Sequence, residues 1–209
     1  MRNDKKTLEE NAKKILDDET SIQVLKSSLQ TSRFSYKRLI LLLIIWFLMM
    51  WQSEIIFLNG NIIDKLLMLI NAVNVIIIPI FALIITGYSI FQAISTGESL
   101  YTLLTNTLEE RSMFQVYNLF FFLISIQFLA IIIMNFILFV IFTNIPVSWQ
   151  LPNFDQEVNE RIASGLLSLY IVIIVHSLIE VKSFIYNLYQ IFSTNAVAKS
   201  IQYLKNKQE

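Results

Sequence analysis

The 209-residue sequence contains no cysteine, one histidine, four glycines and three prolines. The absence of cysteine excludes disulfides, thiolate metal sites and cysteine nucleophiles. The glycines are too scattered for a phosphate-binding loop, and one histidine cannot supply a zinc-hydrolase motif. No acid, base and nucleophile occur together at a spacing typical of catalysis. The sequence therefore predicts no catalytic residue, no metal site and no cofactor, and we expect a protein that is not an enzyme.

Charged residues are also scarce. They make up 15% of the chain, against about 25% in ordinary soluble domains. The segment from Met113 to Phe154 has no charge at all, and about 20 helical residues suffice to cross the hydrocarbon core of a bilayer. The formal net charge is zero, which gives no support to direct nucleic-acid binding. The composition instead indicates an integral membrane protein whose main surroundings are membrane lipids.

Four apolar stretches predict an all-α integral membrane protein with four transmembrane helices. They cover 39–58, 66–86, a part of 114–142, and 162–179, and none alternates with the period of a barrel strand. We expect a cytoplasmic N-terminal helical segment at 1–38, a transmembrane domain at 39–193 and a cytoplasmic tail at 194–209. Within the transmembrane domain, the sequence predicts a cytoplasmic loop at 87–113 and an external loop at 143–161.

Most basic residues flank the apolar stretches at the ends that would face one side of the membrane. Nine of the 16 lysines and arginines precede the first stretch, and only Lys65 and Arg161 fall on the opposite side. Because positively charged flanks stay in the cytoplasm, we expect both termini to be cytoplasmic. The chain is rich in Ile, Asn and Lys, which is typical of AT-rich bacterial genomes, so the expected location is a bacterial inner membrane.

The N-terminal segment carries an apolar repeat of seven residues. Leu8, Ile15, Ile22 and Leu29 form one stripe of an amphipathic helix, and the acidic residues at 17–19 suggest a break between two short helices. The stripe could pack on the protein's own cytoplasmic helices, form a coiled coil with another copy, dock a partner, or lie in the membrane interface.

The second and fourth stretches continue into sequences rich in aromatic and amide residues, which predicts inward helical extensions. The segments 88–96 and 186–194 share Tyr, Gln, Ser and Thr at equivalent positions, which suggests a parallel duplication. Aromatic side chains often anchor interfaces, so a soluble protein partner could bind here. Alternatively, the aromatics pack only against the stripe from Leu8 to Leu29 within the same protein. The candidate partner-binding residues are Phe91, Gln92, Tyr101, Tyr189, Gln190 and Tyr203.

His176 and Glu180 are an ionisable pair in and just after the fourth stretch. They stand four residues apart and share one helix face. Ionisable groups within membrane helices usually face protein or water. One interpretation is an ion- or proton-responsive pair. The other is that Glu180 lies at the interface and His176 makes a structural hydrogen bond.

Uncharged amides occur within the second and third stretches. In lipid, such groups seek partners on other helices, so we expect interhelical contacts; the lining of a pore is the alternative. One four-helix bundle has little room for every amide, which predicts a homo-oligomer. Pro79 should kink the second stretch because it lacks a backbone donor. The candidate amides are Asn71, Asn74, Asn118, Gln127 and Asn135.

The length of about 200 residues, the four stretches, the N-terminal helix and the two extended helices resemble the KwaA-like membrane components of the bacterial Kiwa anti-phage defence system. This resemblance is one of architecture and carries over no site residue. It implies a homo-oligomer in the inner membrane that detects phage-related perturbation and recruits a soluble DNA-binding partner.

Three functions stay open from the sequence. A sensor or scaffold for a soluble cytoplasmic effector is favoured by the sizeable cytoplasmic part. A pore-forming effector that depolarises the membrane is favoured by the amide-rich third stretch. A small transporter or immunity protein is suggested by the repeat, although transporter sites usually involve broken helices, and here only Pro79 interrupts a stretch.

Overall fold

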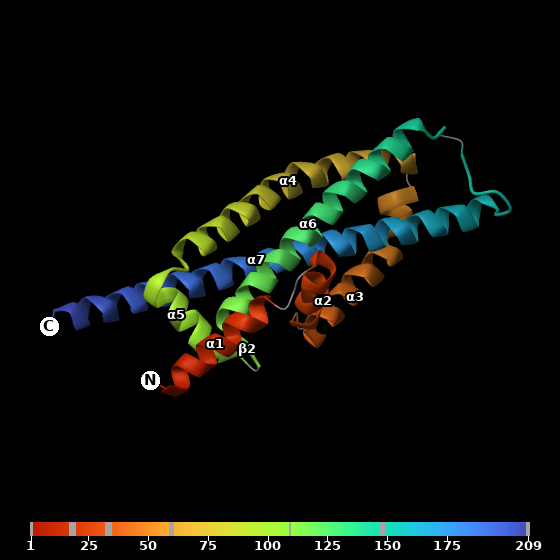
Figure 1. Ribbon diagram of the computed structural model, residues 1–209. Helices are drawn as coiled ribbons and strands as arrows, with labels where there is room; N and C mark the ends of the chain where they lie inside the picture. Colours follow the sequence, from red (N-terminus) through yellow and green to blue (C-terminus); the bar gives the residue numbers. More distant parts are fainter. Residues whose placement is uncertain are drawn as a thin grey trace. The chain divides into compact units, whose positions relative to one another are not determined.

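The computed structural model describes residues 2–16, 20–31, 35–58, 61–108, 110–146 and 149–207. This part of the chain is almost entirely helical, as the sequence predicts. A hairpin of two-residue antiparallel strands was not predicted, because strands this short carry no alternating pattern. In chain order the elements are α1 (Arg2–Leu16), α2 (Ser21–Thr31), α3 (Tyr36–Trp51), the π-helix η1 (Glu54–Leu58), α4 (Ile62–Ile94), α5 (Gly97–Thr105), β1 (Thr107–Leu108), β2 (Arg111–Ser112), α6 (Met113–Asn144) and α7 (Gln156–Asn206) (Figure 1).

Within the described residues, three helices are long and apolar enough to cross a membrane, namely α4, α6 and α7, and the number rises to four if α2 and α3 count together as one span. α4 has 33 residues, α6 has 32 and α7 has 51. At about 1.5 Å per residue, α4 and α6 each measure about 50 Å and α7 about 75 Å. All three exceed the hydrocarbon core of about 30 Å. The chain is a multi-pass, all-α membrane protein.

The first predicted span, 39–58, is not one continuous helix. α3 ends at Trp51, and the π-helix η1 begins only at Glu54. The backbone N–H of Gln52 donates to the carbonyl of Leu48 and closes the last turn of α3. The break coincides with the polar sequence Gln52–Ser53–Glu54, which interrupts the apolar run. α3 alone has 16 residues, fewer than the roughly 20 that a full crossing needs.

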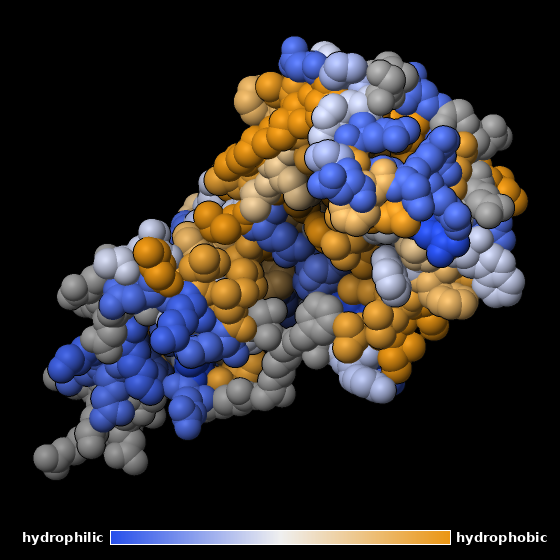
Figure 2. All heavy atoms as spheres, turned by 90° about the vertical axis from the view of Figure 1, so that its right-hand side faces the viewer, coloured by the Kyte–Doolittle hydropathy of each residue, from blue (hydrophilic) through white to orange (hydrophobic). Residues whose placement is uncertain are grey.

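The apolar parts of the helices are largely exposed. Only 22% of the most apolar window of α4 and of α6 is buried, and 33% of that of α7. In α3, all of whose residues are described, Leu42 is the one buried residue. Figure 2 shows the exposed apolar side chains as orange spheres. Lipid tails are as apolar as leucine, so a bilayer accommodates surfaces that would be unfavourable in water.

The structure divides into two compact units, which we describe separately. Unit 1 comprises Met1–Arg33, Ala82–Ile126 and Val181–Glu209, and unit 2 comprises Phe34–Phe81 and Gln127–Glu180. The divisions fall within α4, α6 and α7, so each of these helices contributes residues to both units.

An aromatic cluster forms the core of unit 1. Phe91 of α4, Phe121 of α6 and Phe184 of α7 are almost completely buried. Their ring centroids lie 5.3 Å apart for Phe91 and Phe121 and 5.5 Å apart for Phe121 and Phe184, within the range of favourable aromatic pairs. A Cβ atom on Gly87 would lie 2.4 Å from Cζ of Phe184. Only glycine allows this ring to approach α4 so closely.

Polar contacts hold the smaller elements of unit 1 together. Asn11 of α1 donates through Nδ2 to the carbonyl of Leu104 at 2.7 Å. Arg111 of β2 donates through Nη1 to the carbonyl of Ser27 at 3.1 Å and to Oγ1 of Thr31 at 2.7 Å, both on α2. These contacts connect α1 with α5, and β2 with the last turn of α2.

The predicted continuations of the second and fourth helices are confirmed, because α4 continues to Ile94 and α7 to Asn206. α7 is helical through Asn206, within the segment 194–209. The connection after α6 is shorter than the predicted loop at 143–161, since α6 ends at Asn144 and α7 begins at Gln156. α4 continues through Pro79. The predicted break at 17–19 lies outside the described residues, although α1 and α2 are separate helices.

The N-terminal apolar stripe is divided between these two helices. Leu8 and Ile15 of α1 are half-buried, whereas Ile22 is 77% and Leu29 is 59% exposed. α2 instead buries Ser28. The part of the stripe on α1 therefore packs within the protein, whereas the part on α2 is exposed.

Candidate functional site

An ion pair joins the first turn of α3 to α7 within unit 2. Arg38 donates through Nη1 to Oε1 of Glu180, and the two side chains are 20% and 14% exposed. Arg38 precedes the uncharged part of α3, and Glu180 follows the uncharged part of α7. Burying a charge away from water costs free energy unless the charge is paired. Arg38 and Glu180 therefore each lower the free-energy cost of burying the other.

His176 lies on α7 one turn before Glu180 and is half-buried. The sequence identified His176 and Glu180 but missed Arg38, which is 142 residues away from Glu180. The sequence does contain one signal for this pair. Arg38 directly precedes the first apolar stretch and Glu180 directly follows the fourth, and the positive-inside rule assigns both of these ends to the same side of the membrane.

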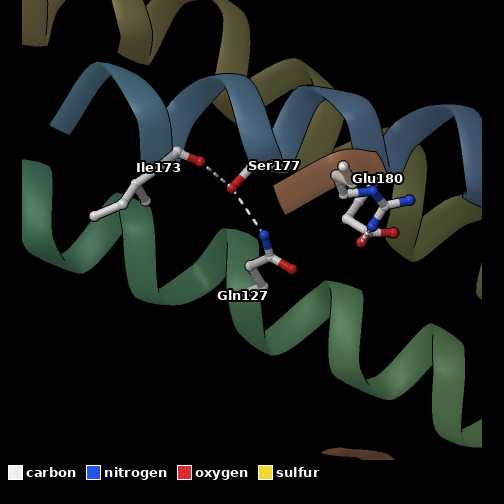
Figure 3. A network of polar contacts seen from close by, with 5 residues as sticks. Gln127, Ile173, Ser177 and Glu180 are labelled. Atoms are coloured by element: carbon white, nitrogen blue, oxygen red, sulfur yellow. Dashed lines mark hydrogen bonds and ion pairs between the residues drawn. The ribbon is translucent and has the colours of Figure 1, made fainter. Parts of the chain in front are cut away.

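Gln127 and Ser177 connect α6 to α7 in the same unit (Figure 3). The amide of Gln127 donates through Nε2 to Oγ of Ser177 at 2.8 Å, and this hydroxyl donates to the carbonyl of Ile173 at 2.9 Å. Ser177 is fully buried. Figure 3 shows Gln127 reaching from α6 toward Ser177, with Glu180 further along α7. The contact gives the amide of Gln127 and the hydroxyl of Ser177 hydrogen-bond partners, which lipid tails cannot provide.

A second network in unit 2 links three helices. The hydroxyl of Tyr170 on α7 donates to Oδ1 of Asn135 on α6 at 2.9 Å, and Nδ2 of Asn135 donates to Oδ1 of Asn74 on α4 at 2.7 Å. Asn135 is fully buried. Because its amide is used both as donor and as acceptor, the cost of burying it is offset. Asn74, Gln127 and Asn135, which the sequence identified as candidates for interhelical contacts, each hydrogen-bond to a residue of another helix.

Asn118 makes the corresponding contact in unit 1. Its Oδ1 on α6 accepts from the hydroxyl of Tyr88 at 2.7 Å and from Nε2 of Gln92 at 3.0 Å, both on α4. Asn118 thus hydrogen-bonds to another helix, while Gln92, expected to bind a partner, uses its amide within the chain. Asn71 is different, because its side chain is exposed on α4. Its contact with another helix stays a prediction.

The other predicted partner-binding residues separate into two groups. Phe91 of α4 is fully buried, which corrects the prediction that it offers a binding surface. Its ring packs against Phe114 and Phe121 of α6, which are not part of the N-terminal stripe. The tyrosines are exposed, with values of 43% for Tyr101, 64% for Tyr189 and 67% for Tyr203.

Gln190, the remaining candidate, donates through Nε2 to the hydroxyl of Tyr186 at 2.9 Å on the surface of α7. Nearby in the same unit lies an open pocket of about 320 Å³ between α5 and α7. On α7 the pocket occupies the stretch of sequence between Tyr189 and Tyr203. It is lined by Thr102, Asn106, Ser193, Thr194, Val197, Ala198 and Ile201.

Among the residues that the structure describes, no group of three or more His, Asp or Glu side chains could hold a metal ion. Comparison with models of protein families, with curated proteins and with solved structures gave no match. The functional argument therefore depends on the geometry of this chain alone.

Proposed function

We propose that this chain is a membrane-embedded sensor or scaffold subunit of a bacterial anti-phage defence system, and that it recruits a soluble cytoplasmic effector. In this proposal the protein is a non-enzymatic homo-oligomer of the inner membrane with both termini in the cytoplasm, as the resemblance to KwaA-like components implies.

The observation that carries the proposal is the length of α7 beyond its apolar part. The segment from Val181 to Asn206 is helical and measures about 39 Å at roughly 1.5 Å per residue. Large aromatic side chains are exposed along it, among them Tyr189 and Tyr203. Tyrosine is enriched among the residues that dominate binding energy at protein interfaces. A helix with exposed tyrosines outside the apolar segment supports a docking role.

The polar contacts of the apolar segments favour a scaffold over a pore within one chain. Gln127 bonds to Ser177, and Asn135 bonds to Asn74 and Tyr170. A water-filled pathway needs polar groups that face the water, whereas these amides are used between helices. The pore interpretation therefore has less support from the arrangement of the amides than the sequence suggested.

A binding measurement tests the proposal. The tagged membrane protein is used to capture soluble cytoplasmic proteins from its host, and a captured protein is then purified and titrated onto the membrane protein in nanodiscs. We expect Tyr189→Ala and Tyr203→Ala together to weaken binding strongly, since truncating one anchoring aromatic costs about 2 kcal/mol or more. Tyr36→Ala is the matched control, because Tyr36 is 74% exposed and belongs to a different helix, α3.

The pore interpretation is tested with the same preparations. The purified protein alone is reconstituted in liposomes, and ion flux is recorded. A scaffold gives no flux without its partner. Flux from the protein alone, or full binding by the double tyrosine variant, would count against the proposed function.

A further inference from the structure

α3 contacts the rest of unit 2 through a narrow face. Its less exposed positions include Arg38, Leu42, Ile45 and Met49, which recur every three or four residues and so lie on one side of the helix. Only Leu42 among them is buried, while most of the remaining α3 side chains are exposed. α3 therefore offers little packed surface to its neighbours.

In a bilayer this narrow face matters more than it would in water. Lipid tails solvate apolar side chains as well as another helix does, so association depends on close packing and polar contacts. α4, α6 and α7 have both, because Asn135 joins all three and Gln127 joins α6 to α7. α3 has a single buried residue and the ion pair between Arg38 and Glu180.

We propose that α3 is a detachable helix and that the Arg38–Glu180 ion pair is the latch that holds it against α7. When the pair is broken, α3 separates from α7, while α4, α6 and α7 stay joined through their amide networks. The two side chains are mostly shielded from water, which strengthens the attraction between their charges. They also remain partly exposed, so that a competing charge can reach them. The proposal stands on the geometry of unit 2 and is independent of partner recruitment.

Distances between spin labels test the latch. The chain has no cysteine, so pairs of labelled cysteines can be introduced without removing native residues. One pair, Leu43→Cys on α3 and Leu169→Cys on α7, replaces side chains that are 53% and 49% exposed. A reference pair, Val75→Cys on α4 and Leu166→Cys on α7, replaces side chains that are 76% and 63% exposed.

In nanodiscs, we expect one narrow distance distribution for each pair in the otherwise wild-type protein. Glu180→Gln should add a population at longer distance for the α3–α7 pair and leave the α4–α7 pair unchanged. Glu157→Gln is the matched control, because it breaks the exposed Arg161–Glu157 ion pair within α7. It should change neither distribution.

A charge swap provides the second variant. Arg38→Glu combined with Glu180→Arg should restore the short α3–α7 distance. Arg38→Gln, which breaks the same ion pair, replaces Glu180→Gln in the test if Glu180→Gln cannot be purified in folded form. The proposal is overturned if Glu180→Gln keeps the wild-type α3–α7 distribution. It is equally overturned if both label pairs shift together, or if the swapped protein folds with α3 displaced.

Discussion

Gly87 shows how one residue without a side chain determines the packing of unit 1. A methyl group on Gly87 would meet the ring of Phe184, which is 1% exposed and packs edge-on against Phe121. Because this ring is buried, we expect Gly87→Ala to destabilise the protein by about 1–3 kcal/mol, the usual cost of overpacking. Thermal unfolding in detergent or nanodiscs measures the change.

Gly165 is the matched control for this prediction. It lies within α7, and a Cβ atom there would meet no atom within 4 Å. Gly165→Ala should be neutral or stabilise the protein by up to about 1 kcal/mol, because alanine restricts the unfolded chain more than glycine does. Equal melting temperatures for the two variants would contradict the packing of Phe184 on Gly87.

Asn135 and Asn71 provide a second comparison at the scale of single residues. Asn135→Leu leaves Asn74 and Tyr170 without their shared partner. A hydrogen bond between membrane helices contributes on average about 0.6 kcal/mol to stability, with a maximum near 1.7 kcal/mol. The loss of both hydrogen bonds of Asn135 should therefore lower the melting temperature clearly. Asn71→Leu removes an exposed amide and should leave the fold intact, but it should weaken the homo-oligomer if Asn71 faces another copy. Native mass spectrometry separates these outcomes.

At the scale of elements, the sequence predicts the long helices better than their contacts. Uncharged apolar runs indicated α4, α6 and α7, because each run has 18 residues or more, close to the length that a bilayer requires. The end of α3 at Trp51 was missed, since a hydropathy window averages over Gln52 and Ser53. The Arg38–Glu180 pair was missed, and the sequence left open whether Phe91 binds a partner or packs within the protein. Both depend on which helices are neighbours, and one sequence does not contain that information. The amides were identified because their chemistry requires a partner wherever they lie.

α2 depends on a side chain from a different element. Arg111 of β2 donates to a backbone carbonyl and to a hydroxyl near the end of α2. Hydrogen bonds from charged groups contribute about 1.5–3 kcal/mol, so Arg111→Ala should speed hydrogen exchange of the last α2 amides by about tenfold or more. Arg161→Ala, which removes an exposed arginine of α7, is the control. Unchanged exchange in α2 would contradict this account.

At the scale of the whole molecule, the distribution of basic residues predicts which ends lie in the cytoplasm. Single cysteines at Asn61 and Gln150 should react with an impermeant thiol reagent in intact cells, whereas single cysteines at Thr20 and Thr107 should be protected. The native chain contributes no background because it lacks cysteine. The reverse labelling pattern would invert the topology and place the exposed α7 tyrosines outside the cell, where no cytoplasmic effector could reach them.

The 16 residues of α3 have a consequence for the bilayer itself. At roughly 1.5 Å per residue, the regular helix is about 24 Å long, about 6 Å shorter than a typical hydrocarbon core. A span that is too short is accommodated by local thinning of the membrane, at a fraction of a kcal/mol for each ångström of mismatch. We therefore expect a higher melting temperature in vesicles of 14-carbon lipids than in vesicles of 20-carbon lipids, and a smaller difference when four leucines are inserted after Leu48. α3 would then be the helix through which membrane thickness acts on the protein.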